Sequence, residues 1–441
     1  MARHIHVLKV HHLTLSFPTR KDPNPRPVLD DVDFGIRDGE ILGLIGNSGS
    51  GKTMTSLAIA GLLPEGAHIT EGSVKFRGED LLTMKPRERR KMLGSEIGMI
   101  FQEPSTALDP LMKVGKNLDE VLITHGMKDP KQRRENILSM MTTVGFTDPE
   151  IIYDRYPHQL SGGQRQRILI AGAALLAPKL LICDEPTSSL DTVTTVQILG
   201  LLKDLCRKLH MTILFISHDL SAVRNFCDRV MVMRNGKIVD KDTTSDILSN
   251  PKNTYTAELL TNARLDPRML GIERAHVDYT SSPVLTARDI TAGYSDSRFG
   301  KGSDNNVLKG IDLEIYPHEI LGLIGSSGCG KTTTMNIVCN IIPKDDGEII
   351  LGEDGTNSIK IGYLPESPSL FGYMNGYEYL RYIAGIEKLE GDTESAITAE
   401  TALAGQLLGD DRLTGGGQFL IAADEMVDAQ VVDIGIIGDA L

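Results

Sequence analysis

The feature that most constrains this chain of 441 residues is a glycine-rich segment that occurs twice. "EILGLIGNSGSGKT" covers Glu40–Thr53, and "EILGLIGSSGCGKT" covers Glu319–Thr332. Each copy joins an apolar stretch to the pattern GxxxxGK[ST], in which glycines let backbone N–H groups converge on phosphate oxygens. The flanking residues also align without a gap, from Val28 in the first copy and from Val307 in the second. The chain is therefore expected to contain an internal repeat with a phosphate-binding loop in each half.

Strand and helix patterns alternate along the chain. "APKLLICDE" (Ala177–Glu185) and "MTILFISHD" (Met211–Asp219) are short, bounded apolar runs, which are typical of buried parallel strands. "HLTLSF" (His12–Phe17) and "LTARDITAGY" (Leu285–Tyr294) alternate between apolar and polar residues, as strands with one exposed face do. In each half we expect an apolar strand, then the glycine loop, then a helix that begins at the lysine. The pattern predicts an α/β fold with a parallel sheet at its core.

The pattern becomes helical between Gln102 and Ser161. "PLMKVGKNLDEVLITHG" (Pro110–Gly126) and "PKQRRENILSMMTTVGF" (Pro130–Phe146) have apolar residues at three- and four-residue spacing, which predicts an inserted helical subdomain. A polar stretch with little periodicity, from about Asn262 to Pro283, is typical of a linker. We predict a complete domain over residues 1–262, a linker over 263–283 and an incomplete second domain over 284–441.

Composition excludes several classes of protein. The formal net charge is -13 and the pI is about 5.4, which argues against nucleic acid as a partner. Hydrophobic residues make up 41% of the chain, the proportion of a globular protein, and no apolar run approaches the ~20 residues that a membrane span requires. The five cysteines lack CxxC spacing, so neither a zinc site nor a disulfide framework is indicated.

In the first half, the phosphate-binding loop is followed by an acidic strand end. Lys52 is expected to reach the β- and γ-phosphates of a nucleotide, and the Thr53 hydroxyl to ligate Mg²⁺. In "KLLICDEP" (Lys179–Pro186), Asp184 would hold Mg²⁺ through water and Glu185 could polarise the attacking water. The loop residues predicted to bind the nucleotide are Gly46, Asn47, Ser48, Gly49, Ser50, Gly51, Lys52 and Thr53.

Two further motifs lie on either side of this strand, "LSGGQRQR" (Leu160–Arg167) and "FISHD" (Phe215–Asp219). With them, nearly all of residues 5–262 resembles the ATP-binding-cassette (ABC) ATPase family. The resemblance implies a P-loop NTPase fold of the ABC ATPase type, with a parallel-sheet core, an antiparallel β subdomain and an inserted helical subdomain. That fold would be repeated here with a truncated second copy. The resemblance also implies ATP and Mg²⁺ as cofactors and ATP hydrolysis as the reaction.

In that family, the signature of one cassette closes over ATP held by the phosphate loop of another. The residues that match the signature, and would contact the γ-phosphate on an opposing cassette, are Ser161, Gly162, Gly163 and Gln164. Gln102 in "IFQEP" matches the Q-loop glutamine, which contacts Mg²⁺ and water, and "SSLD" (Ser188–Asp191) matches the D-loop. His218 matches the switch histidine near the γ-phosphate. Phe17 either stacks on the adenine or packs in the core.

One subgroup of the family is more similar than the others. "MIFQEPSTALDPLMKVG" (Met99–Gly115), "YPHQLSGGQRQR" (Tyr156–Arg167) and "NPKNTYT" (Asn250–Thr256) resemble ATP-binding subunits of peptide and nickel importers. The cysteine-rich segment that many peptide-importer subunits carry after the last motif is missing here, which leaves nickel or another small solute open as cargo. The resemblance implies separate membrane-spanning permease subunits, a solute-binding protein and a cytoplasmic, peripheral location on the inner face of the cell membrane. A soluble tandem-cassette ATPase that remodels a protein or a ribosomal partner is the alternative.

The second half begins like the first but does not continue like it. Its predicted nucleotide-binding residues are Tyr294, beside the adenine, and the loop residues Gly325, Ser326, Ser327, Gly328, Cys329, Gly330, Lys331 and Thr332. Glu366 takes the place of the Q-loop glutamine, while "LTGGGQ" (Leu413–Gln418) and "FLIAADE" (Phe419–Glu425) resemble a distorted signature and a distorted acidic strand. These last two lie too close together to hold a signature helix of the first half's length. A switch histidine at the first half's spacing would fall beyond Leu441.

The two halves therefore cannot complete each other's sites. Lys52, Asp184 and Glu185 would face a missing signature, and Lys331 would face the Ser161 signature without a dependable general base. We expect the first cassette to hydrolyse ATP when it pairs with a cassette from another copy or another subunit. We expect the second half to bind nucleotide without hydrolysing it alone.

Overall fold

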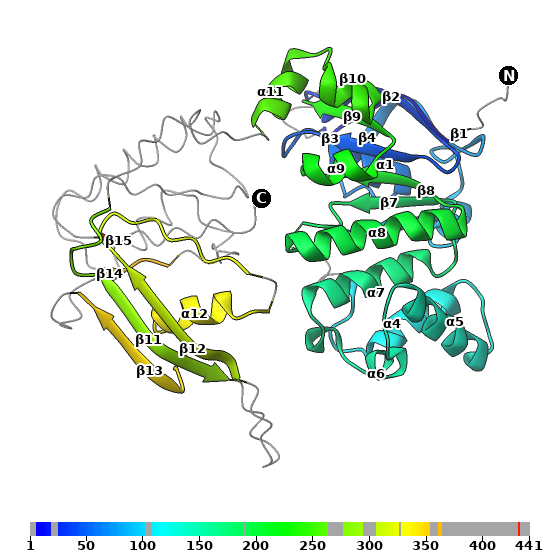
Figure 1. The fold of residues 1–441 in the computed structure, drawn as a ribbon. Helices are drawn as coiled ribbons and strands as arrows, with labels where there is room; N and C mark the ends of the chain where they lie inside the picture. Colours follow the sequence, from blue (N-terminus) through cyan, green and yellow to red (C-terminus); the bar gives the residue numbers. More distant parts are fainter. Residues whose placement is uncertain are drawn as a thin grey trace. The chain divides into compact units, whose positions relative to one another are not determined.

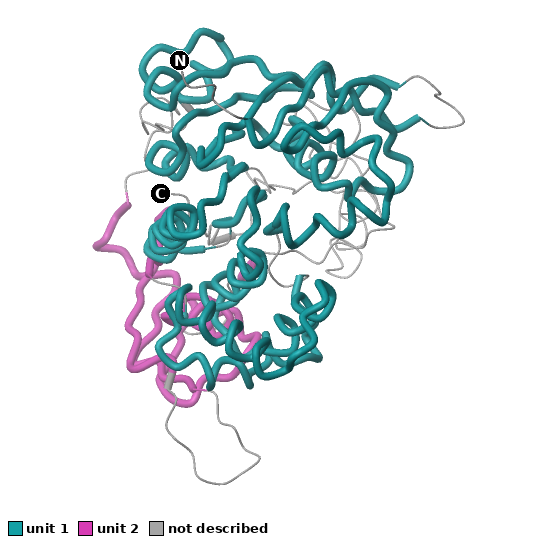
Figure 2. The backbone as a smooth tube through the Cα atoms, turned by 90° about the vertical axis from the view of Figure 1, so that its right-hand side faces the viewer, with its two compact units in different colours: residues 1–273, 326–328, 441 teal, residues 274–325, 329–440 magenta. Residues whose placement is uncertain are grey.

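The computed structural model describes residues 6–18, 25–101, 107–188, 190–262, 277–293, 306–325, 328–352, 360–363 and 431–432. Figure 1 shows the secondary structure, and Figure 2 shows two compact units in different colours. The first unit comprises residues 1–273 with 326–328 and 441, and the second comprises 274–325 with 329–440. Among the described residues, no helix is both long enough and apolar enough to cross a lipid bilayer.

A six-stranded, mostly parallel sheet forms the centre of the first unit, with the strand order β10-β9-β3-β8-β7-β6. Its strands are β3 (Ile41–Ile45), β6 (Ile97–Ile100), β7 (Leu180–Asp184), β8 (Thr212–Ile216), β9 (Arg229–Arg234) and β10 (Lys237–Thr243). Only the β9–β10 pairing is antiparallel among those described in this sheet. Every residue of β3, β7 and β8 is buried. The predicted parallel core with uninterrupted apolar strands is therefore confirmed.

The central sheet is buried on both faces by separate hydrophobic clusters. Alternate residues of β3, such as Ile41 and Ile45, pack with apolar residues of α7 (Gly162–Ala174), α8 (Thr192–Leu209) and α9 (Leu220–Phe226). The residues between them, Leu42 and Leu44, pack with α1 (Lys52–Ala60) and the β subdomain. Because successive side chains of a strand point to opposite faces, a strand covered on both sides must be apolar throughout.

The β subdomain is an antiparallel sheet with the order β2-β1-β4-β5. Its strands are β1 (His6–Ser16), β2 (Leu29–Arg37), β4 (His68–Phe76) and β5 (Glu79–Asp80). Strand β1 pairs with both β2 and β4, and its Leu13 and Leu15 are fully buried, whereas His11 and His12 are exposed. The alternation seen in the sequence therefore predicted this strand and its buried face correctly.

The inserted helical subdomain is also present in the first unit. It contains α4 (Val114–Thr124), α5 (Pro130–Thr143), α6 (Pro149–Tyr153) and the 3-10 helix η1 (Pro157–Gln159), and α7 follows. Asp119 of α4 and Arg133 of α5 form an ion pair of 2.6 Å whose side chains are only 10% and 12% exposed. Other helices described in the first unit are α2 (Pro86–Met92), α10 (Thr244–Ser249) and α11 (Thr254–Asn262).

The described part of the second unit contains a three-stranded antiparallel sheet with the order β12-β11-β13. Its strands are β11 (Leu285–Gly293), β12 (Asn306–Ile315) and β13 (Asp346–Leu351), and helix α12 (Lys331–Val338) packs on them through Ile337 and Val338. A short parallel pair joins β14 (Lys360–Ile361) to β15 (Val431–Val432). The predicted strand over Leu285–Tyr294 corresponds to β11, and the predicted helix begins at the lysine.

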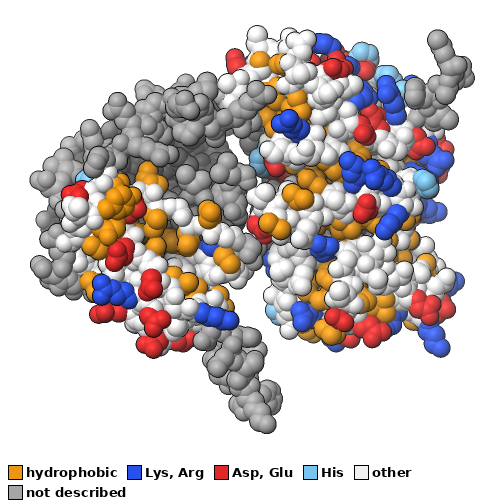
Figure 3. Space-filling view, in the orientation of Figure 1, with side chains coloured by type: hydrophobic (Ala, Val, Ile, Leu, Met, Phe, Trp, Pro, Cys, Tyr) orange, Lys and Arg blue, Asp and Glu red, His pale blue; other side chains and the backbone are white. Residues whose placement is uncertain are grey.

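The prediction of an apolar strand before the second glycine loop is wrong. The letters "EILGLIG" form the buried strand β3 in the first unit, but residues 320–324 form no strand in the second. Ile320 is 80% exposed and Ile324 is 92% exposed, and Figure 3 shows hydrophobic side chains at the surface of the second unit. The physical reason is pairing: β3 is hydrogen-bonded to β8 and β9, whereas no described strand pairs with 320–324.

Candidate active site

The first glycine loop connects β3 to α1 and is shaped by glycines in conformations that other residues avoid. Gly51 has φ 108° and caps the start of α1, where a Cβ atom would lie 2.8 Å from Leu29 Cδ2. At Gly46 a Cβ atom would lie 2.2 Å from the backbone oxygen of Met233. The loop is therefore pressed against neighbouring strands, and only glycine fits these two positions. The loop leads into the start of α1 at Lys52, and the backbone N–H groups at such a helix start bind anionic phosphates.

The side chain of Lys52 folds back over the loop. Its Nζ atom donates to the carbonyl oxygens of Gly46, at 2.8 Å, and Asn47, at 3.0 Å. Lys52 is only 6% exposed, and burial lowers the pKa of its ammonium group, while the carboxylates of Glu185 and Asp184 oppose that shift. A bound phosphate could replace these carbonyl acceptors, because charged oxygens make stronger hydrogen bonds with an ammonium group.

Asp184 lies at the carboxyl end of β7, close to the first turn of α1. Thr53 Oγ1 lies 3.5 Å from Asp184 Oδ1, and Ser56 Oγ lies 3.1 Å from Asp184 Oδ2. Burial raises the pKa of the Asp184 carboxyl, and the hydrogen bonds from Ser56 and Thr53 oppose the increase. The predicted pair of Thr53 and Asp184 is thus brought together. Ser56 was not predicted, although its position three residues after Thr53 places it on the same helix face.

Glu185 and His218 are neighbours at the same edge of the sheet. Glu185 follows β7 with φ 47°, and its backbone N–H donates to Ile216 O at 2.9 Å. This left-handed conformation turns the side chain out of the strand direction. Glu185 Oε2 lies 3.1 Å from His218 Nδ1. This hydrogen bond lowers the pKa of the Glu185 carboxyl and raises the pKa of the His218 imidazole.

The signature residues form the start of α7. Ser161 caps the helix by accepting from Gln164 N at 3.2 Å, and Gln164 Oε1 accepts from Ser161 N at 3.1 Å. A Cβ atom on Gly163 would lie 2.7 Å from Thr194 Cγ2, so α8 passes close to this turn. Among the described residues, no hydrogen bond or ion pair joins Ser161–Gln164 to the phosphate loop of the same unit.

The second glycine loop reproduces part of this geometry. Gly330 has φ 102° and caps α12, and Lys331 Nζ donates to Gly325 O. In the first unit, Phe17 is half-buried and packs against the hydrophobic cluster that contains Leu42 and Leu44. Several predicted residues lie outside the described part of the chain: Gln102, Tyr294, Ser326, Ser327, Glu366 and the segments 413–418 and 419–425. Their roles stay predictions.

Arg89 is a further residue that the sequence did not single out. Its Nη2 atom donates to the carbonyl oxygens of Ala58, at 2.8 Å, and Ile59, at 3.3 Å, in the last turn of α1. A cationic group there satisfies terminal carbonyls and complements the helix dipole. The helix that begins at Lys52 is therefore held at both ends, although Arg89 lies in a basic stretch that otherwise has the composition of a solvated surface.

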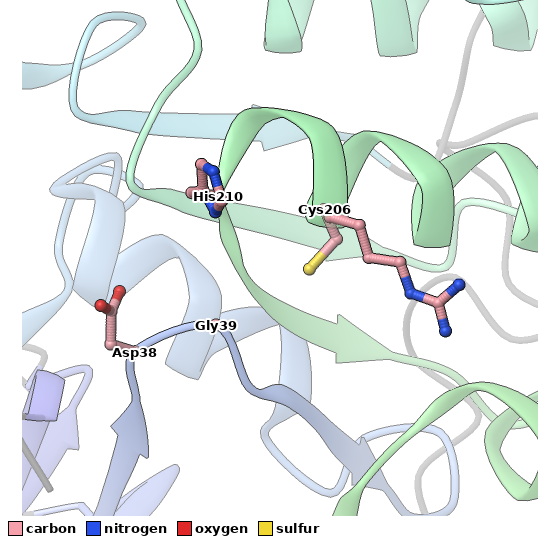
Figure 4. Close-up of a pocket in the computed structure, with 5 residues that line it drawn as sticks. Asp38, Gly39, Cys206 and His210 are labelled. Carbon is pink, nitrogen blue, oxygen red and sulfur yellow. The ribbon is translucent and has the colours of Figure 1, made fainter.

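A separate cavity of about 330 Å³ lies in the first unit (Figure 4). It is lined by Asp38, Gly39, Cys206, Arg207 and His210. Asp38 and Gly39 precede β3, and His210 precedes β8, so the cavity lies at the amino ends of these parallel strands. The glycine loop, Asp184 and Glu185 follow the carboxyl ends. Ligands of open α/β sheets bind at the carboxyl ends, so the cavity is not part of the phosphate site.

Comparison with known proteins identifies the family. The sequence profile of the ABC transporter family matches residues 29–188 and 308–418. The chain belongs to the ABC transporter family. The protein is an ATPase with two segments that match the ABC profile, and its fold is that of a P-loop NTPase of the ABC type.

Several curated relatives are similar over the first unit or beyond. The oligopeptide transport ATP-binding protein AppD of Bacillus subtilis (strain 168) is 44% identical over 257 residues, which are 58% of this chain and 78% of AppD. The dipeptide transport ATP-binding protein DppD of Haemophilus influenzae is 41% identical over 254 residues, 58% of this chain and 76% of DppD. The peptidoglycan transport ATP-binding protein YejF of Agrobacterium fabrum is 40% identical over 309 residues, 69% of this chain and 56% of YejF.

Proposed function

We propose that this ABC protein is the ATP-binding and ATP-hydrolysing subunit of a peptide importer. The observation that carries the proposal is the assembly of Lys52, Asp184, Glu185 and His218 at one edge of the first unit's sheet. The names of AppD and DppD, oligopeptide and dipeptide transport ATP-binding proteins, support peptides as the cargo. Nickel stays an alternative prediction for the cargo.

The site suits Mg²⁺ as well as ATP. Thr53 supplies a hydroxyl and Asp184 a carboxylate that is only 2% exposed, so the donors are the hard oxygens that Mg²⁺ prefers. One carboxylate and one hydroxyl leave room for water and phosphate oxygens, as is usual for Mg²⁺ bound together with a nucleotide. Gln102 is the third ligand proposed from the sequence. When bound, Mg²⁺ would neutralise charge on the β- and γ-phosphate oxygens.

The remaining side chains have distinct roles in hydrolysis. Lys52 would exchange its two carbonyl acceptors for phosphate oxygens when ATP enters. Glu185 stays ionised because His218 lowers the pKa of its carboxyl, so a carboxylate oxygen is available to accept a proton from the attacking water. His218 Nδ1 orients that carboxylate at 3.1 Å. The chemistry therefore depends on positioning and charge, as phosphoryl transfer generally does.

The signature would act on ATP held by another cassette. Ser161, Gly162, Gly163 and Gln164 begin a helix whose N-terminal amides suit a phosphate. We propose that residues 1–262 form the working cassette, that 263–283 form a linker, and that 284–441 bind nucleotide without a complete hydrolytic set. The opposing cassette would come from another copy of the chain or from a separate subunit.

As an importer subunit, the protein would bind membrane-spanning permease subunits from the cytoplasmic face. A solute-binding protein would deliver the cargo on the other side of the membrane. Nucleic acid is not a proposed partner, given the net charge of -13. The soluble tandem-cassette alternative predicts a protein or ribosomal partner instead of a permease.

The test is to isolate the full chain in complex with its partner, using a variant that binds ATP without hydrolysing it. The Glu185→Gln variant is expected to retain ATP and to hold its complex closed, because only the proton acceptor is changed. It would be expressed with an affinity tag, and its partners isolated from detergent-solubilised membranes with and without ATP and Mg²⁺. Recovery of a multi-span permease, followed by peptide-stimulated ATPase activity of that complex, supports the proposal. Recovery of ribosomes or a soluble enzyme contradicts it, and stimulation by nickel alone would replace the peptide assignment.

A further inference from the structure

A hydrogen bond outside the ABC motifs joins the end of the first unit to its phosphate loop. The backbone N–H of Asn47 donates to Tyr255 Oη at 3.2 Å. Asn47 is the second residue of the glycine loop, and Tyr255 lies in the first turn of α11. Tyr255 belongs to "NPKNTYT" (Asn250–Thr256), a segment that resembles importer subunits.

The ring of Tyr255 is held from several directions. It is only 6% exposed, and the Arg234 guanidinium lies over it, with Cζ at 4.5 Å from the ring centroid. A cation over an aromatic face is attractive and fixes the plane of the ring. The backbone N–H of Tyr255 donates to Asn253 Oδ1 at 2.9 Å. The hydroxyl is therefore presented to the loop by a ring with little freedom to move.

The turn before Tyr255 is fixed by a buried carboxylate. Asp240 Oδ2 accepts from the backbone N–H of Lys252, at 3.1 Å, and of Asn253, at 3.2 Å. Asp240 lies in β10 and is 6% exposed. Hydrogen bonds from backbone N–H groups to a buried carboxylate are among the stronger ones in proteins. This turn thus ties the start of α11 to the same sheet that carries the phosphate loop.

The other side of Asn47 faces the catalytic lysine. Asn47 O accepts from Lys52 Nζ at 3.0 Å, while Asn47 N–H donates to Tyr255. The side chain of Asn47 is exposed, so burial does not hold this residue in place. The tyrosine hydroxyl therefore holds the backbone of Asn47, whose carbonyl oxygen accepts a hydrogen bond from the ammonium group of Lys52.

We propose that Tyr255 is a positioning residue for ATP binding, acting through the backbone of Asn47 on the phosphate loop and Lys52. The segment Asn250–Asn262 is then part of the nucleotide site of this ABC protein. A loop already ordered before ATP arrives loses less conformational entropy on binding, which strengthens binding. Loss of the hydroxyl should weaken ATP binding and leave the chemical step unchanged, since Glu185 is positioned by His218 and Asp184 by Thr53 and Ser56.

The test compares two tyrosines that both lie under an arginine. Tyr255→Phe removes the hydroxyl and retains the ring under Arg234. Tyr153→Phe is the matched control, because Arg134 lies 4.4 Å from the Tyr153 ring in the helical subdomain. All full-length variants, including the reference, would carry Lys331→Ala so that nucleotide binding reports on the first loop. The measurements are KM for ATP, kcat, the melting temperature and amide hydrogen exchange of residues 46–51.

Tyr255→Phe is expected to raise KM for ATP by roughly fivefold, the size of one hydrogen bond, with kcat within twofold of the reference. Residues 46–51 should exchange faster without nucleotide, and the melting temperature should fall by no more than about 2–4 °C, the cost of one hydrogen bond. Tyr153→Phe should alter none of these values. An unchanged KM and unchanged exchange in Tyr255→Phe would overturn the proposal. A larger fall in the melting temperature, together with a several-fold loss of kcat, would overturn it too, because α11 would then only support the fold.

Discussion

The same seven letters, "EILGLIG", have different surroundings in the two units, which allows one substitution to be compared at matched positions. Leu44 lies in β3 and is 1% exposed, between β8 and β9. Leu323 occupies the corresponding position of the second copy, is 43% exposed and belongs to no described strand. Leu44→Ala and Leu323→Ala are therefore chemically identical changes in the same local sequence. Any difference in their effects must come from tertiary structure.

The expected effects differ several-fold. Replacing a fully buried leucine by alanine lowers the free energy of unfolding by about 3–5 kcal/mol, because the lost transfer free energy adds to the cost of the cavity. For a domain of this size each kcal/mol lowers the melting temperature by roughly 2–4 °C, so Leu44→Ala should lower it by roughly 6–20 °C. Leu323→Ala shortens a half-exposed side chain, so it should lower the free energy of unfolding by about 0.5 kcal/mol or less, close to the limit of detection.

Differential scanning calorimetry of the full chain is the suitable assay, because the chain contains no tryptophan to report unfolding by fluorescence. The transition that moves in Leu44→Ala identifies the first unit. Ile45→Val and Ile324→Val form a milder control pair, at residues that are 1% and 92% exposed. If Leu323→Ala lowered a transition as much as Leu44→Ala does, the second copy would be a buried strand and the reasoning would be refuted.

Three further predictions concern the first unit. Glu185→Gln should lower kcat by at least about 10²-fold with unchanged ATP affinity, checked by phosphate release and titration calorimetry; normal turnover would remove Glu185 as proton acceptor. Gly163→Ala should lower the free energy of unfolding by roughly 1 kcal/mol, because the new Cβ would lie 2.7 Å from a threonine side chain. Gly162→Ala is the control, since the atom nearest to its new Cβ lies at 3.8 Å. Equal denaturant midpoints for the two variants would contradict this expectation. Arg89→Met should lower the melting temperature by about 2–4 °C relative to the exposed neighbour variant Arg90→Met, and equal values would disprove the capping role.

The parts of the site that the sequence predicts are those encoded in short stretches of backbone. A glycine loop, a lysine at the start of a helix and an acid at the end of an apolar strand are local patterns. Gly51 and Lys52 meet that expectation at the start of α1, and Asp184 does so at the end of β7. The approach of Thr53 to Asp184 also follows, since carboxyl ends of parallel strands share one edge of a sheet.

The residues that the sequence did not reveal act across long stretches of chain. Arg89 reaches the end of α1 from another helix, and Tyr255 reaches Asn47 from the end of the unit. No periodicity or motif spacing in the sequence predicts either contact. The strand expected at 320–324 does not form for a related reason. Its composition favours a strand, but a strand also needs neighbours with which to exchange hydrogen bonds, and none of the described strands pairs with it.

The start of α7 bears on how many cassettes one ATP requires. A helix leaves its first four backbone N–H groups without intrahelical acceptors, and Ser161 accepts the one from Gln164. Gln164 Oε1 accepts from the N–H of Ser161. A phosphate would suit the N–H groups of Gly162 and Gly163, and in the described residues no hydrogen bond joins this helix start to the unit's own phosphate loop. Lys52, Asp184, Glu185 and His218 already converge without it. This arrangement supports the proposal made above, in which the signature acts on a nucleotide held by another cassette and hydrolysis takes place at an interface between cassettes.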